Sequence, residues 1–478
     1  MLRFISKSMD KKIYEEKKSS MHPMMLMVYV VLLCTALSYI IPAGQYDREY
    51  SEETGVSLLI PDSFHYVERT HTNVLDVLMS LTKGMQQASY IIFFLMIVGG
   101  MFSIMNGTGA LNIALANGLK RMKGREILMI PLLMIFFGCG AAFCGNFEEF
   151  LVFVPIILAC CMTVGYDSLT AVGIIFFAAT AGYGGAVTNA FTEGVAQEIA
   201  GLPKYSGAGL RSILFIILLA ASILYVMINA RIVKENHKFS GSYSYDKEFN
   251  RGKMINMENI PPLKKRHILA ILTFLAGLVF TVIGIIKWDF YIDELAGIFL
   301  AVGILCGVIG GLKTKDICDC FIKGCKDMIL PCIMIGLANA SMVILNEANV
   351  LDTILYSMAG LLRKVPDTLM PIGMFVFHEI FNIFVPSGSA QANITMPLMV
   401  VLADNAHITR QTAVLAYQLG DAFTNIMSPT GGEILAALAI CRVPFVKWVR
   451  YLLPLFIIWW LIAFVVLLVA SGMGYGPM

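Results

Sequence analysis

The stretch LGDAFTNIMSPTGGEILAAL, Leu419 to Leu438, decides what kind of fold this sequence can form. It is apolar at both ends and carries Pro429 and two successive glycines in the middle, and such residues break a helix. A broken helix at membrane depth survives only where it lines a cavity whose groups satisfy the exposed backbone. We therefore expect a break near the membrane midplane at Thr424 to Glu433 and another at Thr188 to Gly194. The alternative for each is a kink that serves only packing.

Around this stretch the chain has the composition of a membrane protein. Of its 478 residues, 58% are hydrophobic and 14% are charged, whereas soluble domains average about 45–50% and about 25%. The 35 Lys+Arg and 33 Asp+Glu nearly cancel, which removes the positive field that nucleic-acid binding requires. The 11 cysteines are scattered, so neither a disulfide framework nor a structural metal is indicated. The composition predicts an all-α polytopic membrane protein.

Several apolar runs are long enough to cross a bilayer core of about 30 Å, which takes about 20 residues of helix. The first run follows mixed-charge residues and has no small-residue cleavage site behind it, so we expect a retained helix and not a signal peptide. The uninterrupted runs are Met24 to Ala43, Leu210 to Ala230, Ile268 to Ile286, Leu295 to Leu312, Met328 to Leu345 and Leu453 to Ala470.

Basic residues predict the side that each loop faces, because positive loops stay cytoplasmic. Five segments, 1–22, 119–126, 231–266, 312–326 and 441–450, hold 26 of the 35 Lys and Arg residues. The other nine, Arg211 among them, are assigned to the alternate loops. We therefore expect a bacterial-type cell membrane protein with its N-terminus in the cytoplasm and its C-terminus outside.

The two halves of the chain resemble each other weakly. At a spacing of 240, Lys83-Gly84 recurs as Lys323-Gly324, and at 242 Thr188 recurs as Thr430. Each half has the order helix, polar-tipped pair, interrupted helix, helix, and the loop charges give the pairs opposite orientations. Such inverted repeats are typical of secondary transporters. We expect a cytoplasmic N-terminal segment at 1–23, a first inverted repeat at 24–232, a cytoplasmic linker at 233–265, a second inverted repeat at 266–471 and a tail at 472–478.

The first polar-tipped pair is predicted to be a re-entrant hairpin. Its arms, Ile127 to Phe143 and Phe150 to Gly165, are each about 25 Å long as helices, which is short for a full span. The tip is Cys144 to Glu149. Asn146 and Glu149 also have the spacing of a capping box, and both interpretations can hold at once.

The second pair has its tip at Val385 to Asn393. We expect hydroxyls, an amide and a helix N-terminus to meet there, a setting that suits a carboxylate. The alternative is an ordinary turn between two spans. The polar residues of this tip are Ser387, Gly388, Ser389 and Asn393.

The acids predicted at membrane depth are the strongest clue to chemistry. The segments that hold them contain no Lys or Arg, and central acids cost about 2.5–3.5 kcal/mol each on an insertion scale. One explanation is that some cap half-helices or lie near an interface; the favoured one is that the positive charge arrives with the cargo, as a cationic substrate, Na⁺ or H⁺. The six acids are Glu148, Glu149, Glu193, Glu379, Asp421 and Glu433.

Two local patterns extend this hypothesis. Residues three or four apart share a helix face, so one polar stripe is predicted to lead into the second break: Asp421, Thr424, Asn425 and Ser428. His378 beside Glu379 suggests a proton relay together with Glu148. An intramembrane metalloprotease would need a second His at position 382, which is Asn382, so that class is remote.

Four runs carry a resemblance to a known family: GNFEEFLVFVPI (145–156), GGAVTNAFTEG (184–194), FVPSGSAQANITMPLM (384–399) and the opening stretch, 419–438. They resemble the YfcC-like group of the C4-dicarboxylate anaerobic carrier family, in the ion transporter superfamily, over about residues 24–470. Members are described as basic amino acid antiporters, some as arginine/ornithine exchangers. The resemblance implies homodimers with a scaffold domain and a transport domain. The implied binding residues are Asn146, Glu149, Thr188, Asn189, Glu193, Ser387, Ser389, Asn393, Asp421, Asn425, Ser428 and Thr430.

The sequence thus predicts two inverted repeats, each with a re-entrant helical hairpin and a broken transmembrane helix. We expect a secondary transporter that exchanges cationic amino acids by alternating access, without a cofactor or a bound metal. Helix N-termini would hold the α-carboxylate, and Glu149, Glu193, Asp421 or Glu433 the cationic end. The alternative is a Na⁺- or H⁺-coupled importer of carboxylates or peptides on the same fold.

Overall fold

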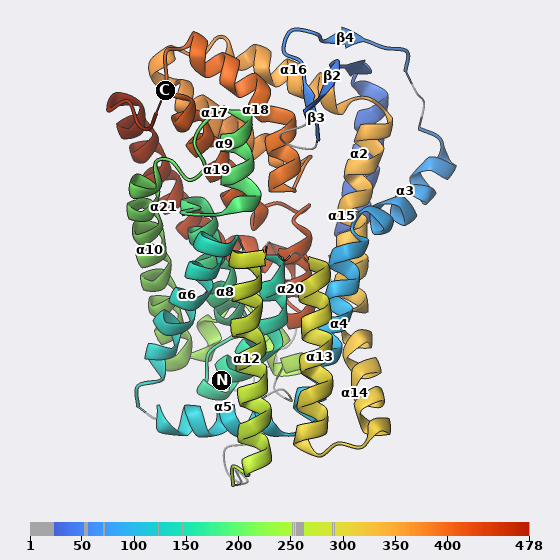
Figure 1. Ribbon diagram of the computed structural model, residues 1–478, viewed down its shortest axis with the longest axis vertical. Helices are drawn as coiled ribbons and strands as arrows, with labels where there is room; N and C mark the ends of the chain where they lie inside the picture. Colours follow the sequence, from blue (N-terminus) through green and yellow to red (C-terminus); the bar gives the residue numbers. More distant parts are fainter. Residues whose placement is uncertain are drawn as a thin grey trace, which may run out of the picture.

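The computed structural model describes residues 23–51, 56–69, 72–122, 124–145, 147–250, 252, 254, 262–288, 290 and 292–477. The predicted N-terminal segment lies outside this part of the chain, apart from its last residue. Nearly everything described is helical, as predicted (Figure 1). Within the described residues, seven helical stretches are long and apolar enough to cross a membrane. One of them, Ser168–Ile199, begins with α8 (Ser168–Gly185), in which every residue is buried, and this helix forms the centre of the bundle.

The helices of the first half follow the predicted runs and interruptions. They are α2 (Pro23–Ile40), α3 (Val74–Gln87), α4 (Ser89–Gly107), α5 (Ala110–Arg121), η1 (Glu126–Leu128), α6 (Met129–Cys139), η2 (Gly140–Cys144), η3 (Glu148–Phe153), α7 (Val154–Val164), α8 (Ser168–Gly185), η4 (Ala190–Gly194), α9 (Val195–Ile199) and α10 (Ala208–Glu235).

The second half begins after three short turns of helix, η5 (His237–Phe239), α11 (Tyr243–Tyr245) and η6 (Asp246–Asn250). Its helices are α12 (Lys265–Trp288), α13 (Ile292–Gly310), α14 (Thr314–Asp327), α15 (Ile329–Glu347), α16 (Leu351–Leu362), η8 (Asp367–Leu369), α17 (Met370–Asn382), α18 (Gly388–Asn405), α19 (Arg410–Asn425), α20 (Gly432–Cys441) and α21 (Phe445–Gly472).

The halves match in element order and in length. Helices α3 and α14 both have 14 residues, α4 and α15 have 19, α5 and α16 have 12, and α10 and α21 have 28. Matching helices lie at opposite ends of the molecule: α5 at the bottom of Figure 1 and α16 at the top, with α6 and α8 below α17 and α19. The two hairpins therefore approach the middle from opposite ends.

Four short strands were not expected in an all-α chain. β1 (Gly44–Gln45) pairs with β4 (His65–Tyr66), and β2 (Arg48–Ser51) with β3 (Val56–Leu59), both antiparallel. Strands β1 and β2 contact α16, and β3 packs against α18. The Arg48 guanidinium lies 2.8 Å from the Asp352 carboxylate of α16, and the rings of Phe64 and Tyr356 stack at 4.1 Å. These contacts fix the segment between α2 and α3 as a cap at the end of the bundle that carries α16.

The predicted linker is folded where it is described. Helix α10 continues to Glu235, three residues past the predicted boundary, and the division into repeats and linker stays a prediction. Asp246 accepts hydrogen bonds from the backbone N–H of Ser168 (3.1 Å) and from Ser242 Oγ (2.7 Å). Asn250 Nδ2 donates to the Cys441 carbonyl at 2.8 Å. The linker thus joins the start of α8 to the end of α20.

Candidate functional site

The structure interrupts its helices at all four predicted places. The first hairpin turns between η2 and η3, and the second between α17 and α18. The broken helices stop and resume between α8 and η4 and between α19 and α20. Gly145 follows η2 with a φ of +72°, and a Cβ there would lie 2.5 Å from Asn189 Oδ1. The first tip therefore needs a glycine, because it passes so close to the first break.

A cavity of about 110 Å³ lies where these interruptions meet. Three carboxylates line it: Glu148 and Glu149 at the start of η3, and Glu433 at the start of α20. Ser387, Gly388 and Ser389 line it from the second hairpin, and Asn425 and Thr430 from the second break. Helices α4, α13 and α15 close the other side. Residues far apart in the sequence are thus gathered around one polar space.

The electrostatics of this cavity combine two opposite features. No Lys or Arg occurs among its described lining residues. Helices α18 and α20 both begin at the cavity, and neither N-cap residue, Ser387 or Gly431, caps its helix through a side chain. Because a helix N-terminus carries partial positive charge and unpaired N–H groups, the cavity offers carboxylates on one side and anion-binding backbone on the other.

Each broken helix is fastened to the hairpin of its own half by a threonine. Thr188 Oγ1 donates to the carbonyl of Phe143 at 2.9 Å, and Thr430 Oγ1 donates to the carbonyl of Ile383 at 2.8 Å. Thr188 serves this contact and does not line the cavity, whereas Thr430 does both. The threonines paired by the sequence spacing of 242 thus play the same structural part in both halves.

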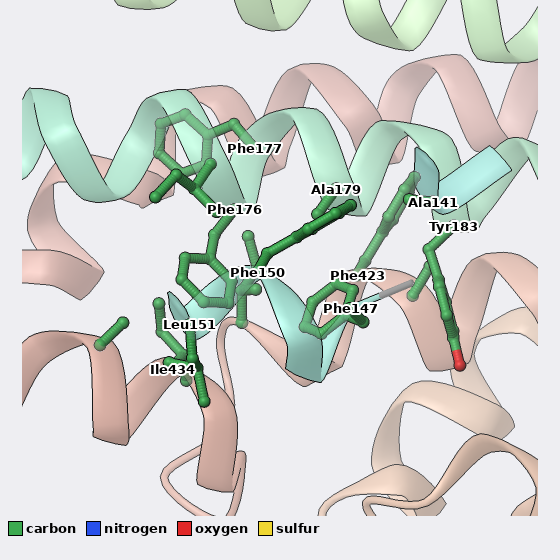
Figure 2. Close-up of a cluster of buried hydrophobic side chains, with 14 of the residues drawn as sticks. Ala141, Phe147, Phe150, Leu151, Phe176, Phe177, Ala179, Tyr183, Phe423 and Ile434 are labelled. Carbon is green, nitrogen blue, oxygen red and sulfur yellow. The ribbon is translucent and has the colours of Figure 1, made fainter. Parts of the chain in front are cut away.

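The first hairpin tip is also held by aromatic packing. The Phe147 ring lies 5.7 Å from that of Phe176 and 5.3 Å from that of Tyr183, both on α8. Figure 2 shows Phe147 and Phe150 beneath α8, next to Phe176. This packing fixes the turn from which Glu148 and Glu149 project.

Asp421 lies behind the second hairpin and not in the cavity wall. Its Oδ1 accepts a hydrogen bond from Asn382 Nδ2 at 2.7 Å, and its Oδ2 accepts one from Asn425 Nδ2 at 3.4 Å. Asn382 also donates to Gln391 Oε1 at 3.0 Å. The predicted stripe exists in part, since Asn425 reaches Asp421, but the carboxylate is buried and already holds two amides. The prediction that it contacts cargo directly finds no support in this geometry.

Glu193 is the clearest correction to the sequence analysis. Its Oε1 lies 2.5 Å from Arg211 Nη1, and both side chains are fully buried. Gln411 Nε2 also donates to Oε1 at 3.1 Å. The charge pattern assigns Arg211 to a loop, although Arg211 lies inside the predicted span Leu210 to Ala230. Its position inside that span is the sequence signal for a cation at membrane depth. One of the six acids, Glu193, therefore has a cationic partner within the protein and does not require a positive charge from the cargo.

His378 and Glu379 face different neighbours, so their predicted relay is not formed in this structure. The ring of His378 contacts Gln391, with 3.2 Å between Nδ1 and Nε2. Glu379 Oε1 accepts a hydrogen bond from Trp460 Nε1 at 2.7 Å. Neither residue lines the cavity that holds Glu148.

The remaining predicted residues have local roles or cannot be placed. Asn146 lies outside the described residues, so its part of the capping box stays a prediction. Glu149 accepts a hydrogen bond from the backbone N–H of Phe147 at 3.1 Å. Asn189 caps η4 by accepting from the N–H groups of residues 191 and 192. Ser428 Oγ contacts Thr430 Oγ1 at 2.5 Å. Asn393 on α18 and Thr424 on α19 do not line the cavity.

A larger cavity, of about 680 Å³, lies about one helical turn further along α4 and α15. Leu95 and Pro331 line it four residues from Ile91 and Ile335, which line the smaller cavity. Phe249 of the linker also lines it. The polar site thus lies next to a wider space at the end of the molecule that carries α14.

A bundle of apolar helices whose two hairpins and two broken helices surround a polar cavity has the architecture of a membrane transporter. The comparisons with known proteins agree. The chain matches the C4-dicarboxylate anaerobic carrier family over residues 21–472, and it belongs to that family. The metalloprotease alternative is thereby set aside, because this is a family of carriers.

A curated relative and two solved structures are similar to the chain. The Escherichia coli protein named "Putative basic amino acid antiporter YfcC" is 33% identical over 408 residues, which are 83% of this chain and 80% of that protein. The YdaH transporter of Alcanivorax borkumensis is 16% identical, with a TM-score of 0.43, covering 96% of this chain and 100% of its own. MtrF of Neisseria gonorrhoeae is 15% identical, with a TM-score of 0.43 and coverages of 96% and 97%.

Proposed function

We propose that this carrier exchanges basic amino acids of the arginine and ornithine type across a bacterial-type cell membrane by alternating access. One observation carries the proposal: Glu148 and Glu433 line a cavity whose described lining residues include no Lys or Arg. Since central acids are costly without a positive partner, a cationic cargo supplies what the site lacks. The name of the relative from E. coli supports the same class of substrate.

The two kinds of charge in the cavity match the two ends of such a cargo. The N-termini of α18 and α20, which have no side-chain cap, suit an α-carboxylate. The free N–H groups at a helix N-terminus can donate hydrogen bonds to an anion. The carboxylates of Glu148, Glu149 and Glu433 suit the guanidinium or ammonium at the far end. We assign the cationic end to these three acids and no longer to Glu193 or Asp421, since protein groups already hold both.

Alternating access would follow from an inverted repeat in the two halves. The equal helix lengths and the opposite positions of α5 and α16 support this relation. With it we propose the predicted orientation, N-terminus inside and C-terminus outside, and a homodimer of the kind that the family resemblance implies. The larger cavity would then be the route by which cargo reaches the site from the α14 end.

Counterflow in proteoliposomes tests the substrate class. Vesicles loaded with ornithine should take up labelled arginine, and external lysine should compete, while succinate and fumarate should have no effect. The alternative is a Na⁺- or H⁺-coupled importer of carboxylates, which the two helix N-termini at the cavity also favour. Uptake of a dicarboxylate that depends on a Na⁺ or pH gradient, without arginine exchange, would establish that alternative and refute the exchanger.

A further inference from the structure

Arg211 and Trp448 hold matching positions in the two halves. Each is the fourth residue of a 28-residue helix, α10 and α21 respectively. Arg211 donates from Nε to the carbonyl of Ala186 and from Nη2 to the carbonyl of Val187, both at 3.2 Å. Trp448 Nε1 donates to the carbonyl of Ile426 at 2.8 Å. Both side chains are fully buried, and both serve carbonyls at the end of a broken helix.

Such donors are needed because a broken helix leaves its last carbonyls without intrahelical partners. Inside a membrane protein those groups have no bulk water, so protein must supply the hydrogen bonds. At the first break the backbone is also strained, since Ala186 has a φ of +37°, which a residue with a Cβ rarely adopts. This conformation persists only when the surroundings enforce it.

The two breaks are held with different strength. At the first break, the guanidinium of Arg211 donates to the two break carbonyls. It also donates to the Ser206 carbonyl at 2.6 Å and forms the ion pair with Glu193. At the second, Trp448 supplies one neutral donor. Hydrogen bonds that involve a charged group are roughly twice as strong as neutral ones. The first break is therefore the more firmly fixed of the two.

Arg211 does not line the cavity, but a short chain of contacts connects it to the carboxylates there. It fixes residues 186–187, directly before Thr188. The Thr188 hydroxyl and N–H donate to the carbonyls of Phe143 and Ala142, which precede the first hairpin tip. Glu148 and Glu149 are the last two residues of that tip. A shift of the break would therefore move both acids.

We propose that Arg211 is a positioning residue of the transport site, which holds the first break so that Glu148 and Glu149 face the cavity. The claim that this positioning affects cargo binding rests on the proposed function. Glu193 balances the charge of Arg211, and this explains a fully buried acid at a place that cargo does not reach. Trp448 is the corresponding residue of the second half, where it holds the break that carries Glu433.

The test compares Arg211→Lys with Trp448→Phe. Lysine keeps the charge opposite Glu193 but cannot reach the break carbonyls with a planar fork. Hydrogen exchange, measured without cargo, should quicken about tenfold or more in segments 186–194 and 143–150 of Arg211→Lys and stay unchanged in 424–433. Trp448→Phe should show the reverse. Unchanged exchange in 143–150 of Arg211→Lys would overturn the proposal.

Arginine counterflow separates positioning from a merely structural part. Arg211→Lys should raise the KM about tenfold or more at an unchanged amount of inserted protein. If instead Vmax falls in proportion to the amount of inserted protein while KM stays normal, Arg211 has only a structural role, and the proposal is refuted. If Arg211→Lys does not insert, the charge-balanced pair Glu193→Gln with Arg211→Gln takes its place. If the natural protein exchanges no arginine, the proposed cargo fails, while the hydrogen-exchange result still decides the positioning.

Discussion

Glu193 and Arg211 form a fully buried ion pair with 2.5 Å between Oε1 and Nη1. The pair separates the acids of this carrier into two groups. Glu193 is balanced within the protein, and breaking such a buried pair would leave a costly charge behind. Glu148 and Glu433 line the cavity, where the described lining residues include no Lys or Arg. The positive charge that cargo would bring therefore concerns the second group.

Glu433→Gln should weaken arginine exchange. It removes a charge from the cavity wall and keeps the size of the side chain, so a charge-assisted contact of about 1.5–3 kcal/mol is lost, or about ten- to a hundredfold in affinity. The measurement is the KM of arginine counterflow at equal amounts of inserted protein. Glu379→Gln is the control, because Glu379 accepts a hydrogen bond from Trp460 outside the cavity. The KM of this variant for arginine should stay the same. An unchanged KM for Glu433→Gln would remove Glu433 from the site.

Asp421→Asn should destabilise the second hairpin and reduce transport through it. The new side chain keeps one acceptor oxygen, so its amide nitrogen must face one of the two Nδ2 groups, of Asn382 or Asn425, that now donate to the carboxylate. An unmet buried donor costs about 1–3 kcal/mol, which thermal unfolding in detergent should register. The exchanged pair Asn382→Asp with Asp421→Asn restores one donor and one acceptor. It should recover stability; if only the single variant is stable, the network does not act as described.

Cysteine labelling should establish the orientation. In intact cells an impermeant thiol reagent should modify Tyr66→Cys, on the exposed strand β4, and leave Lys247→Cys in the linker unmodified. The native Cys318 is exposed on α14 and belongs to the same predicted side as the linker, so it should not react either. Permeabilised cells, in which all three react, provide the control. The opposite pattern in intact cells would invert the proposed topology.

The docked linker should loosen as the pH rises. Burial raises the pKa of the Asp246 carboxyl above its ordinary range. Because the folded state then holds the proton more tightly than the unfolded state, this contribution to docking is full below about pH 4 and is lost as the pH rises through the folded pKa. Limited proteolysis of the linker, normalised to an unfolded peptide of the same sequence, should therefore quicken with pH. Asp246→Asn should show no such trend, and a wild-type linker that becomes more resistant with pH would contradict this assignment.

Local chemistry alone determined much of this molecule. Apolar runs gave the spans, since hydropathy and length are properties of a single segment. The second break followed from Pro429 and the glycines at 431 and 432, because such residues break a helix. The polar residues at those breaks and at the hairpin tips were therefore visible in the sequence, and several of them line the cavity: Glu148, Glu149, Ser387, Gly388, Ser389, Asn425, Thr430 and Glu433.

Tertiary structure decided which of those polar groups are available. Arg211 lies 18 residues from Glu193, and Asn382 lies 39 residues from Asp421, and nothing in the sequence between them indicates contact. A polar side chain in a membrane bundle takes whichever partner the packing of other helices brings within about 3 Å, and that partner determines whether its charge is already balanced. The positions of the acids are thus a property of the sequence, whereas their roles depend on the fold.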